Sequence, residues 1–169
     1  MSLIGKKLLN LFGKTSKRDS SVAIPSYEQA KRIAVLYTFE DEKKEEAVDA
    51  LKELIDVTKK VDILCFIDKK EIPYGKHPSF RIEQLSNWGK INSEEVEKFL
   101  ETPYDYLIHL DFEMNEIIKN LLTNTKAKCR VGFHADSASS YYELMIGMNK
   151  SAGTTNFAEQ IVKYIKAIR

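Results

Sequence analysis

The sequence predicts an α/β fold, a three-layer Rossmann-like sandwich with a mostly parallel sheet of five or six strands. From residue 31 onward, short apolar runs alternate with stripes of apolar residues at helical spacing. The runs lack the apolar–polar alternation of a half-exposed strand, which indicates burial on both faces of a parallel sheet. The connections are short, and parallel neighbours require right-handed crossover helices. A length of 169 residues fits one such domain, and 43% hydrophobic with 30% charged residues excludes collagenous, disulfide-scaffold and disordered classes.

Residues 1–30 are predicted to form an amphipathic leader helix and a linker, and residues 31–169 the Rossmann-like domain. Four apolar residues share one face of the leader: Ile4, Leu8, Leu11 and Phe12. We expect this face to attach the domain to a partner protein or to a second copy in a homo-oligomer. The alternative is peripheral contact with a membrane. No signal-peptide core or membrane span is recognisable, and Cys65 and Cys129 read as buried free thiols, so a cytoplasmic location is expected.

The first half of the domain is expected to hold two strong strands and one weak one. The strong strands are Arg32–Thr38 and Val61–Ile67, joined by a helix within residues 41–58 whose apolar residues share one face. Residues 68–92 are irregular, and a weaker strand is expected within residues 79–85.

The second half is expected to hold three strands and three helices. Asn92, followed three residues later by Glu95, is typical of a capping box that opens a short helix. Apolar stripes predict a helix over residues 114–122 and a final helix capped by Thr155 or Asn156. The strands are expected at Tyr104–Leu110, Cys129–Phe133 and Tyr142–Ile146, the last of them short and near a sheet edge.

The charge pattern gives little support to nucleic acid as a partner. With 26 basic and 25 acidic residues the formal net charge is +1, so no global field favours a polyanion. One irregular segment is basic and aromatic, and could instead be a solvated loop over a small apolar cluster. Its residues are Lys69, Lys70, Tyr74, Lys76, His77, Phe80, Arg81 and Trp88.

The loop after the first strand argues against a dinucleotide cofactor. It carries Glu40, Asp41 and Glu42 where such a site would present glycines and backbone amides to a phosphate. Carboxylates at this position repel phosphate and suit the first turn of a helix. No cofactor is therefore predicted. No metal site is predicted either, because the sequence contains no recognised metal-ligand spacing.

Polar residues follow the fourth and fifth strands, at the edge of the sheet where Rossmann-like domains bind ligands. If the two strands are neighbours, a candidate ligand rim forms from His109, Asp111, His134, Asp136 and Ser137. Such groups could act as acid and base or bind a metal. The other interpretation is a capped, hydrogen-bonded loop with no ligand.

Two segments carry a resemblance to a known family. Residues 104–111 read YDYLIHLD, and residues 127–133 read AKCRVGF after an intervening helix. This pattern resembles the N-terminal domain of heptosyltransferase-type glycosyltransferases of the two-domain GT-B fold, which implies a Rossmann-like domain here. His109 departs from the acidic residue of that pattern. The family also holds its donor sugar mainly in a second domain that 169 residues do not provide, so transferase activity is not expected.

The same segments, together with Tyr141–Ile146 and Asn156–Ile168, resemble a family of small uncharacterised bacterial proteins. We therefore expect a soluble α/β domain that is non-catalytic and acts by protein interaction or self-association. The alternative is a small-ligand-binding or glycosyltransferase-related domain that uses the rim at the carboxyl ends of the fourth and fifth strands.

Overall fold

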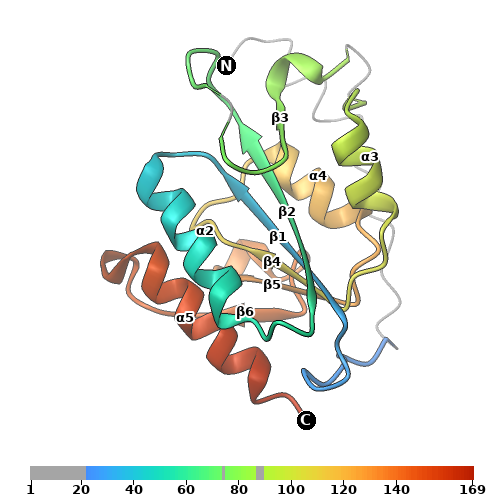
Figure 1. Ribbon diagram of the computed structural model, residues 1–169, viewed down its shortest axis with the longest axis vertical. Coiled ribbons are helices and arrows are strands. Elements are labelled where there is room, and N and C mark those ends of the chain that lie inside the picture. Colours follow the sequence, from blue (N-terminus) through green and yellow to red (C-terminus); the bar gives the residue numbers. More distant parts are fainter. Residues whose placement is uncertain (1–21, 74, 87–89) are drawn as a thin grey trace.

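A computed structural model describes residues 22–73, 75–86 and 90–169. Six strands form one sheet in the order β3-β2-β1-β4-β5-β6, and every neighbouring pair is parallel (Figure 1). The predicted α/β, Rossmann-like class is confirmed. The strands are β1 (Arg32–Thr38), β2 (Lys60–Ile67), β3 (Ser79–Arg81), β4 (Tyr106–His109), β5 (Cys129–Phe133) and β6 (Leu144–Ile146).

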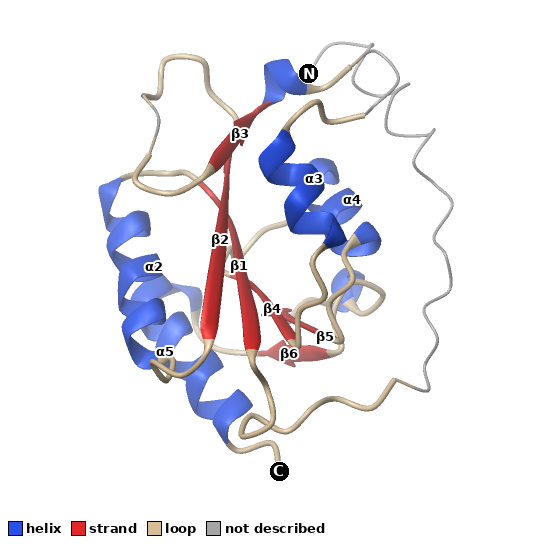
Figure 2. Cartoon of the chain, turned by 45° about the vertical axis from the view of Figure 1, so that its right-hand side comes forward, coloured by secondary structure: helices blue, strands red, loops and turns tan. Residues whose placement is uncertain are grey.

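Helices cover both faces of the sheet (Figure 2). On one face α2 (Glu42–Leu54) and α5 (Gly153–Lys166) pack on the sheet, and on the other face α3 (Glu94–Glu101) and α4 (Glu116–Asn124) do so. Strand β1 contributes to both cores because successive side chains point to opposite faces. Val35 and Tyr37 belong to the α2–α5 core and Leu36 to the α3–α4 core, all fully buried.

The strand order places the topological switch point between β1 and β4. The chain builds outward from β1 through β2 to β3, then returns to the other side of β1 and continues through β4 and β5 to β6. The carboxyl ends of β1 and β4 therefore lie side by side where the order reverses, which is where doubly wound sheets bind their ligands.

Helix starts differ from the predictions in two places. Ser93, not Asn92, caps α3, because its hydroxyl accepts a hydrogen bond from the Val96 N–H at 3.4 Å. The last helix begins at Gly153, before Thr155, and Gly153 has φ +86°, a conformation that favours glycine.

The weak strand predicted within residues 79–85 is shorter than expected. Only Ser79–Arg81 pair with β2, and a single 3₁₀ turn, Ile82–Gln84, follows directly.

The described part of the predicted linker packs against the domain. Tyr27 is buried and its N–H donates to the Ile168 carbonyl at 3.2 Å, while the Tyr106 hydroxyl donates to the Pro25 carbonyl. The predicted leader helix, with the partner and membrane contacts expected of it, lies outside the described residues. Within the described ranges, no helix is both long enough and apolar enough to cross a bilayer.

Candidate functional site

A buried polar network fills the switch point. Asp111 follows β4 and one of its oxygens, Oδ2, accepts the Thr38 N–H at 2.9 Å from the end of β1. The same oxygen lies 3.0 Å from His109 Nε2. Its other oxygen, Oδ1, forms an ion pair of 2.8 Å with Lys44 Nζ. With Tyr142, these residues make up what we call the His109 network: Lys44, His109, Asp111 and Tyr142.

The hydrogen bonds define the protons of the His109 ring. A carboxylate accepts hydrogen bonds, so His109 Nε2 carries the proton and donates to Asp111. The other nitrogen, Nδ1, then accepts from the Tyr142 hydroxyl at 2.7 Å. Burial raises the pKa of Tyr142, which keeps this hydroxyl protonated as the donor.

Asp111 stays ionised in this network. Burial alone would raise the pKa of Asp111, but the interactions of its carboxylate with His109 and Lys44 outweigh burial and lower the pKa. An Asp111 carboxylate therefore lies where a doubly wound domain holds the anionic group of a ligand.

The His109 network is closed to substrate. His109 is fully buried, and both of its ring nitrogens already have partners. A general base must come within hydrogen-bond reach of a substrate proton. His109 has no exposed surface and Asp111 is only 4% exposed, with both carboxylate oxygens already in contact with Thr38, His109 or Lys44. The arrangement holds β1, β4 and α2 together rather than presenting a reactive group.

The predicted ligand rim separates into two sets. His109 and Asp111 are buried, whereas His134, Asp136 and Ser137 are exposed on the connection after β5. Strands β4 and β5 are neighbours as the rim required. No hydrogen bond or ion pair joins the two sets, and no group of three or more His, Cys, Asp or Glu side chains suited to a metal occurs in the described ranges.

Three residues of the basic and aromatic segment, His77, Phe80 and Arg81, are engaged in contacts within the domain. Arg81 donates to the Ile72 carbonyl at 2.5 Å, and Phe80 is fully buried against Phe66. His77 Nε2 lies 3.1 Å from Asp49. Tyr74 and Trp88 lie outside the described residues. Lys69, Lys70 and Lys76 are exposed, whereas Phe80 is buried and Arg81 is bonded to the backbone, so neither of these two is available to stack on or pair with a nucleic acid.

The edge of β2 is free over its first half. β3 pairs only with Cys65, Phe66 and Ile67. The Lys60 N–H donates toward β1 and the Cys65 N–H toward β3, each at 2.9 Å. Because consecutive strand residues point their backbone groups to opposite neighbours, Val61 and Ile63 point theirs away from β1. In the described part of the chain no strand lies beside them.

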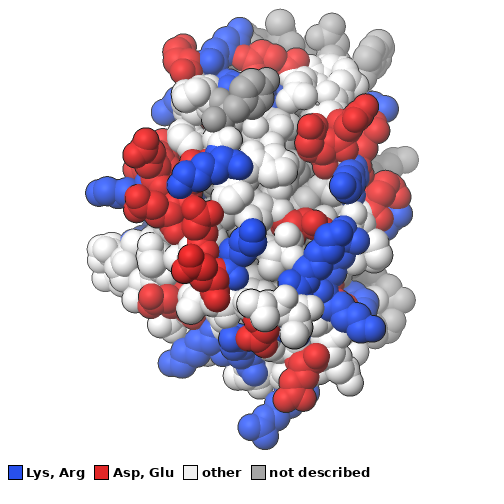
Figure 3. Space-filling view, in the orientation of Figure 1, with Lys and Arg blue, Asp and Glu red and all other residues white. Residues whose placement is uncertain are grey.

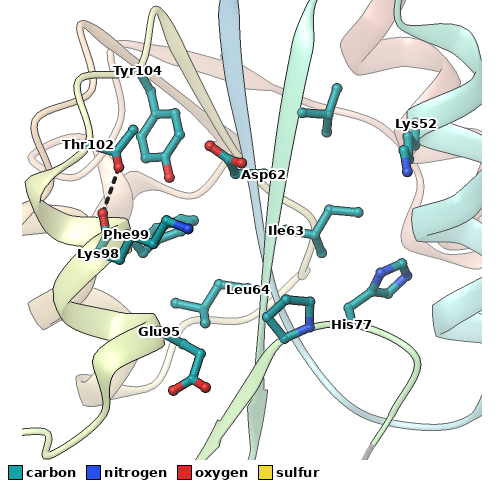
Figure 4. Close-up of a pocket in the computed structure, with 12 residues that line it drawn as sticks. Lys52, Asp62, Ile63, Leu64, His77, Glu95, Lys98, Phe99, Thr102 and Tyr104 are labelled. Atoms are coloured by element: carbon teal, nitrogen blue, oxygen red, sulfur yellow. Dashed lines mark hydrogen bonds between the residues drawn. The ribbon is translucent and has the colours of Figure 1, made fainter.

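A groove of about 300 Å³ follows this free edge, between α2 on one side and α3 on the other (Figure 4). We call it the β2 groove. Pro78 ends it where β3 begins, since a proline has no N–H to continue the ladder. Its lining consists of Lys52, Val61, Asp62, Ile63, Leu64, His77, Pro78, Glu95, Lys98, Phe99, Thr102 and Tyr104.

Sequence reasoning did not find the β2 groove. The run Val61–Ile67 correctly predicted a strand, and residues 64–67 are buried as expected whereas residues 61–63 are half-buried. Burial of the faces says nothing about the edges. Pro78 just before a weak strand was the available signal, because proline in a sheet is confined to edges and strand starts.

Comparison with known proteins places the chain in a family without giving it an activity. Residues 2–168 match the model of a family of unknown function, DUF6913. The chain belongs to this family. Neither the curated proteins nor the solved structures contain a match. For this member of DUF6913, the comparisons show no relation to glycosyltransferases, so function must be argued from its own geometry.

Proposed function

We propose that this domain is a non-catalytic protein-interaction module that takes up an extended partner segment as an added strand beside β2. The observation that carries the proposal is the set of backbone groups of Val61 and Ile63 that point into the β2 groove without a strand partner in the described chain. A free edge is a template for another chain, and strand addition is a recurring mode of peptide recognition.

The closed switch point supports the non-catalytic part of this proposal. The ligand position of the fold is filled by the Asp111 carboxylate, which Lys44 and His109 hold in place. The proposal does not include glycosyl transfer, because the phosphates of a donor nucleotide would be repelled by the Asp111 carboxylate and by Glu40 and Asp41 in the loop after β1. We also propose a cytoplasmic location, which is supported by two buried free thiols, Cys65 and Cys129. Burial raises the pKa of Cys65 to about 12 and leaves that thiol unreactive.

Amide hydrogen exchange tests whether the edge is open. In the full chain the Val61 and Ile63 amides are expected to exchange on the order of 100-fold faster than those of Asp62 and Leu64, which face β1. Residue-resolved exchange measured by NMR makes the comparison within one strand. Equal protection of the two sets would contradict an open edge.

Strand addition is tested by removing one amide. Peptides that bind the full chain are selected from a displayed library of random peptides of about 12 residues. The affinity of each selected peptide is then measured for the variants Ile63→Pro and Ile63→Ala. Both variants lose the isoleucine side chain. Only the proline variant also loses the backbone N–H of residue 63, which faces the groove. Binding is expected to fall at least about tenfold in Ile63→Pro relative to Ile63→Ala, roughly the contribution of one hydrogen bond.

Circular dichroism shows whether each variant is folded. If Ile63→Pro does not fold, Val61→Pro replaces it, because the Val61 N–H also faces the groove. If no selected peptide discriminates the proline from the alanine variant, the module does not bind by strand addition.

A further inference from the structure

Strand β2 divides the β2 groove into two sides. Successive side chains of a strand point to opposite faces of the sheet. Ile63 points to the α2 side, whereas Asp62 and Leu64 point to the α3 side (Figure 4). Val61 shares the side of Ile63 and packs against the same core. An extended partner beside β2 alternates in the same way, so consecutive side chains of the partner would meet the two sides in turn.

The α2 side of the groove presents apolar surface that is incompletely buried. Val61 and Ile63 are half-buried and pack against the α2–α5 core. The residues of β2 that pair with β3, residues 65–67, are buried. β2 is therefore covered where a strand lies beside it and only partly covered where none does. Apolar side chains opposite Val61 and Ile63 would remove this surface from water, which is the dominant favourable term in most protein association.

The α3 side presents polar groups instead. Its apolar residues are at most 4% exposed and leave a partner little to cover: Leu64, Phe99 and Tyr104. The Asp62 side chain is 28% exposed, and Arg32 Nε holds its carboxylate at 2.8 Å. Glu95 and Lys98 are exposed. An apolar side chain opposite Asp62 would remove part of that carboxylate from water without offering it a hydrogen bond, which is costly.

Charge adds no preference to this difference in polarity. Glu95 and Lys98 have opposite signs, and Asp62 is already paired with Arg32. Figure 3 shows acidic and basic groups together on the face of the molecule that carries α2 and α3. The groove therefore distinguishes partners by where their apolar side chains fall along the strand, not by the sign of their charge.

A second copy of the domain fits the groove less well than a single extended segment. When two β2 edges pair antiparallel about a two-fold axis, only one register engages both Val61 and Ile63 of each copy. That register places the Asp62 residues of the two copies directly opposite each other, and like charges in this position are destabilising. The helices α2 and α3 also flank each edge and would have to pass those of the other copy.

We propose that the β2 groove binds an extended partner segment in which two apolar residues, two positions apart, flank a polar residue. The apolar side chains lie opposite Val61 and Ile63 on the α2 side, and the polar side chain lies opposite Asp62 on the α3 side. β-branched residues fit the apolar positions best, because they pack well on a pleated, half-buried surface. This inference rests on the proposed function and names the class of partner.

A serine scan of the bound peptide tests the alternation. The probe is the library binder that loses most affinity on Ile63→Pro relative to Ile63→Ala, and each of its residues is replaced in turn by serine. Roughly tenfold losses of affinity are expected at two apolar positions that are two residues apart. The residue between them should change the affinity less than about threefold.

Variants of the domain test which side of the groove the apolar positions meet. Val61→Thr/Ile63→Thr keeps the backbone groups and the branched side chains but makes the α2 side polar. It is expected to bind the parent peptide roughly tenfold more weakly, and the two sensitive peptide positions should then tolerate serine. Val57→Thr is the matched control, because Val57 is fully exposed and lies outside the groove lining, and it should bind as the wild type does. Circular dichroism reports folding, and Val61→Thr alone replaces the double variant if that does not fold.

Failure of this inference is distinguishable from failure of the proposed function. If the sensitive peptide positions are adjacent, or remain equally sensitive on Val61→Thr/Ile63→Thr, the polarity pattern is wrong, and strand addition stands as long as Ile63→Pro weakens binding more than Ile63→Ala. If no peptide discriminates those two variants, both proposals are wrong. Val61 and Ile63 amides that are already protected in the free chain would also overturn both, and protection that rises with protein concentration would identify a second copy as the occupant.

Discussion

Replacing Lys44 by methionine is expected to lower the free energy of unfolding at pH 7 by about 3–5 kcal/mol. Lys44 is almost fully buried, and its ammonium group lies 2.8 Å from the buried Asp111 carboxylate. The methionine removes that charge and leaves the carboxylate in a site with little access to water. Urea denaturation followed by circular dichroism measures the loss.

The pH dependence separates this cause from lost packing. The folded pKa of Asp111 is lowered, so its contribution to stability is present above its unfolded value, about 3.9, and is lost as pH falls through the folded value. Without Lys44, burial acts on Asp111 with less opposition and its pKa rises. The gap between wild type and Lys44→Met should therefore narrow as pH falls toward about 4.

Lys43→Met is the matched control for this prediction. Lys43 is the exposed neighbour of Lys44 on the same helix, and its replacement should change stability by no more than about 0.5 kcal/mol. If the two variants lose the same amount, or if the loss in Lys44→Met does not depend on pH, the Lys44–Asp111 pair is not what holds this part of the domain together.

Secondary structure was predictable here because each element carries a local signal. Strand Arg32–Thr38 is an unbroken apolar run, and its observed bounds match the prediction. The layered arrangement follows from parallel strands joined by short crossovers. The edge of β2 has no such signal, because its freedom depends on where another segment turns away. The chain before β3 leaves the sheet toward α2, where the Lys76 N–H donates to Glu45 Oε1 at 3.0 Å.

The sequence was sufficient to predict which residues follow the fourth and fifth strands, but not whether their side chains face a ligand or the protein interior. His109 and Asp111 were placed at the carboxyl end of their strand by the apolar run before them. Whether they face a ligand or the interior depends on Lys44 and Tyr142, which lie far from them in sequence. His134, Asp136 and Ser137 follow the neighbouring strand, but there the chain leaves the sheet and exposes them.

Replacing Gly132 by alanine is expected to lower the free energy of unfolding by about 2–4 kcal/mol, which combines overpacking with the loss of one buried hydrogen bond. Gly132 lies in β5 beneath the Tyr142 ring, and an added Cβ would lie 2.2 Å from the Tyr142 Cζ atom. The ring must move, and the hydroxyl that donates to His109 moves with it. Thermal and urea unfolding measure the loss.

A double-mutant cycle attributes that loss to its cause. Once Tyr142→Ala has removed the ring, the added methyl of Gly132→Ala has room, so it should cost much less in that background than in the wild type. Gly147→Ala is the matched control, since a Cβ there would meet His134 at an ordinary 3.6 Å. A Gly132→Ala loss no greater than that of Gly147→Ala would mean that Tyr142 can leave His109 at little cost. The His109 network would then be held by Lys44 and Asp111 alone.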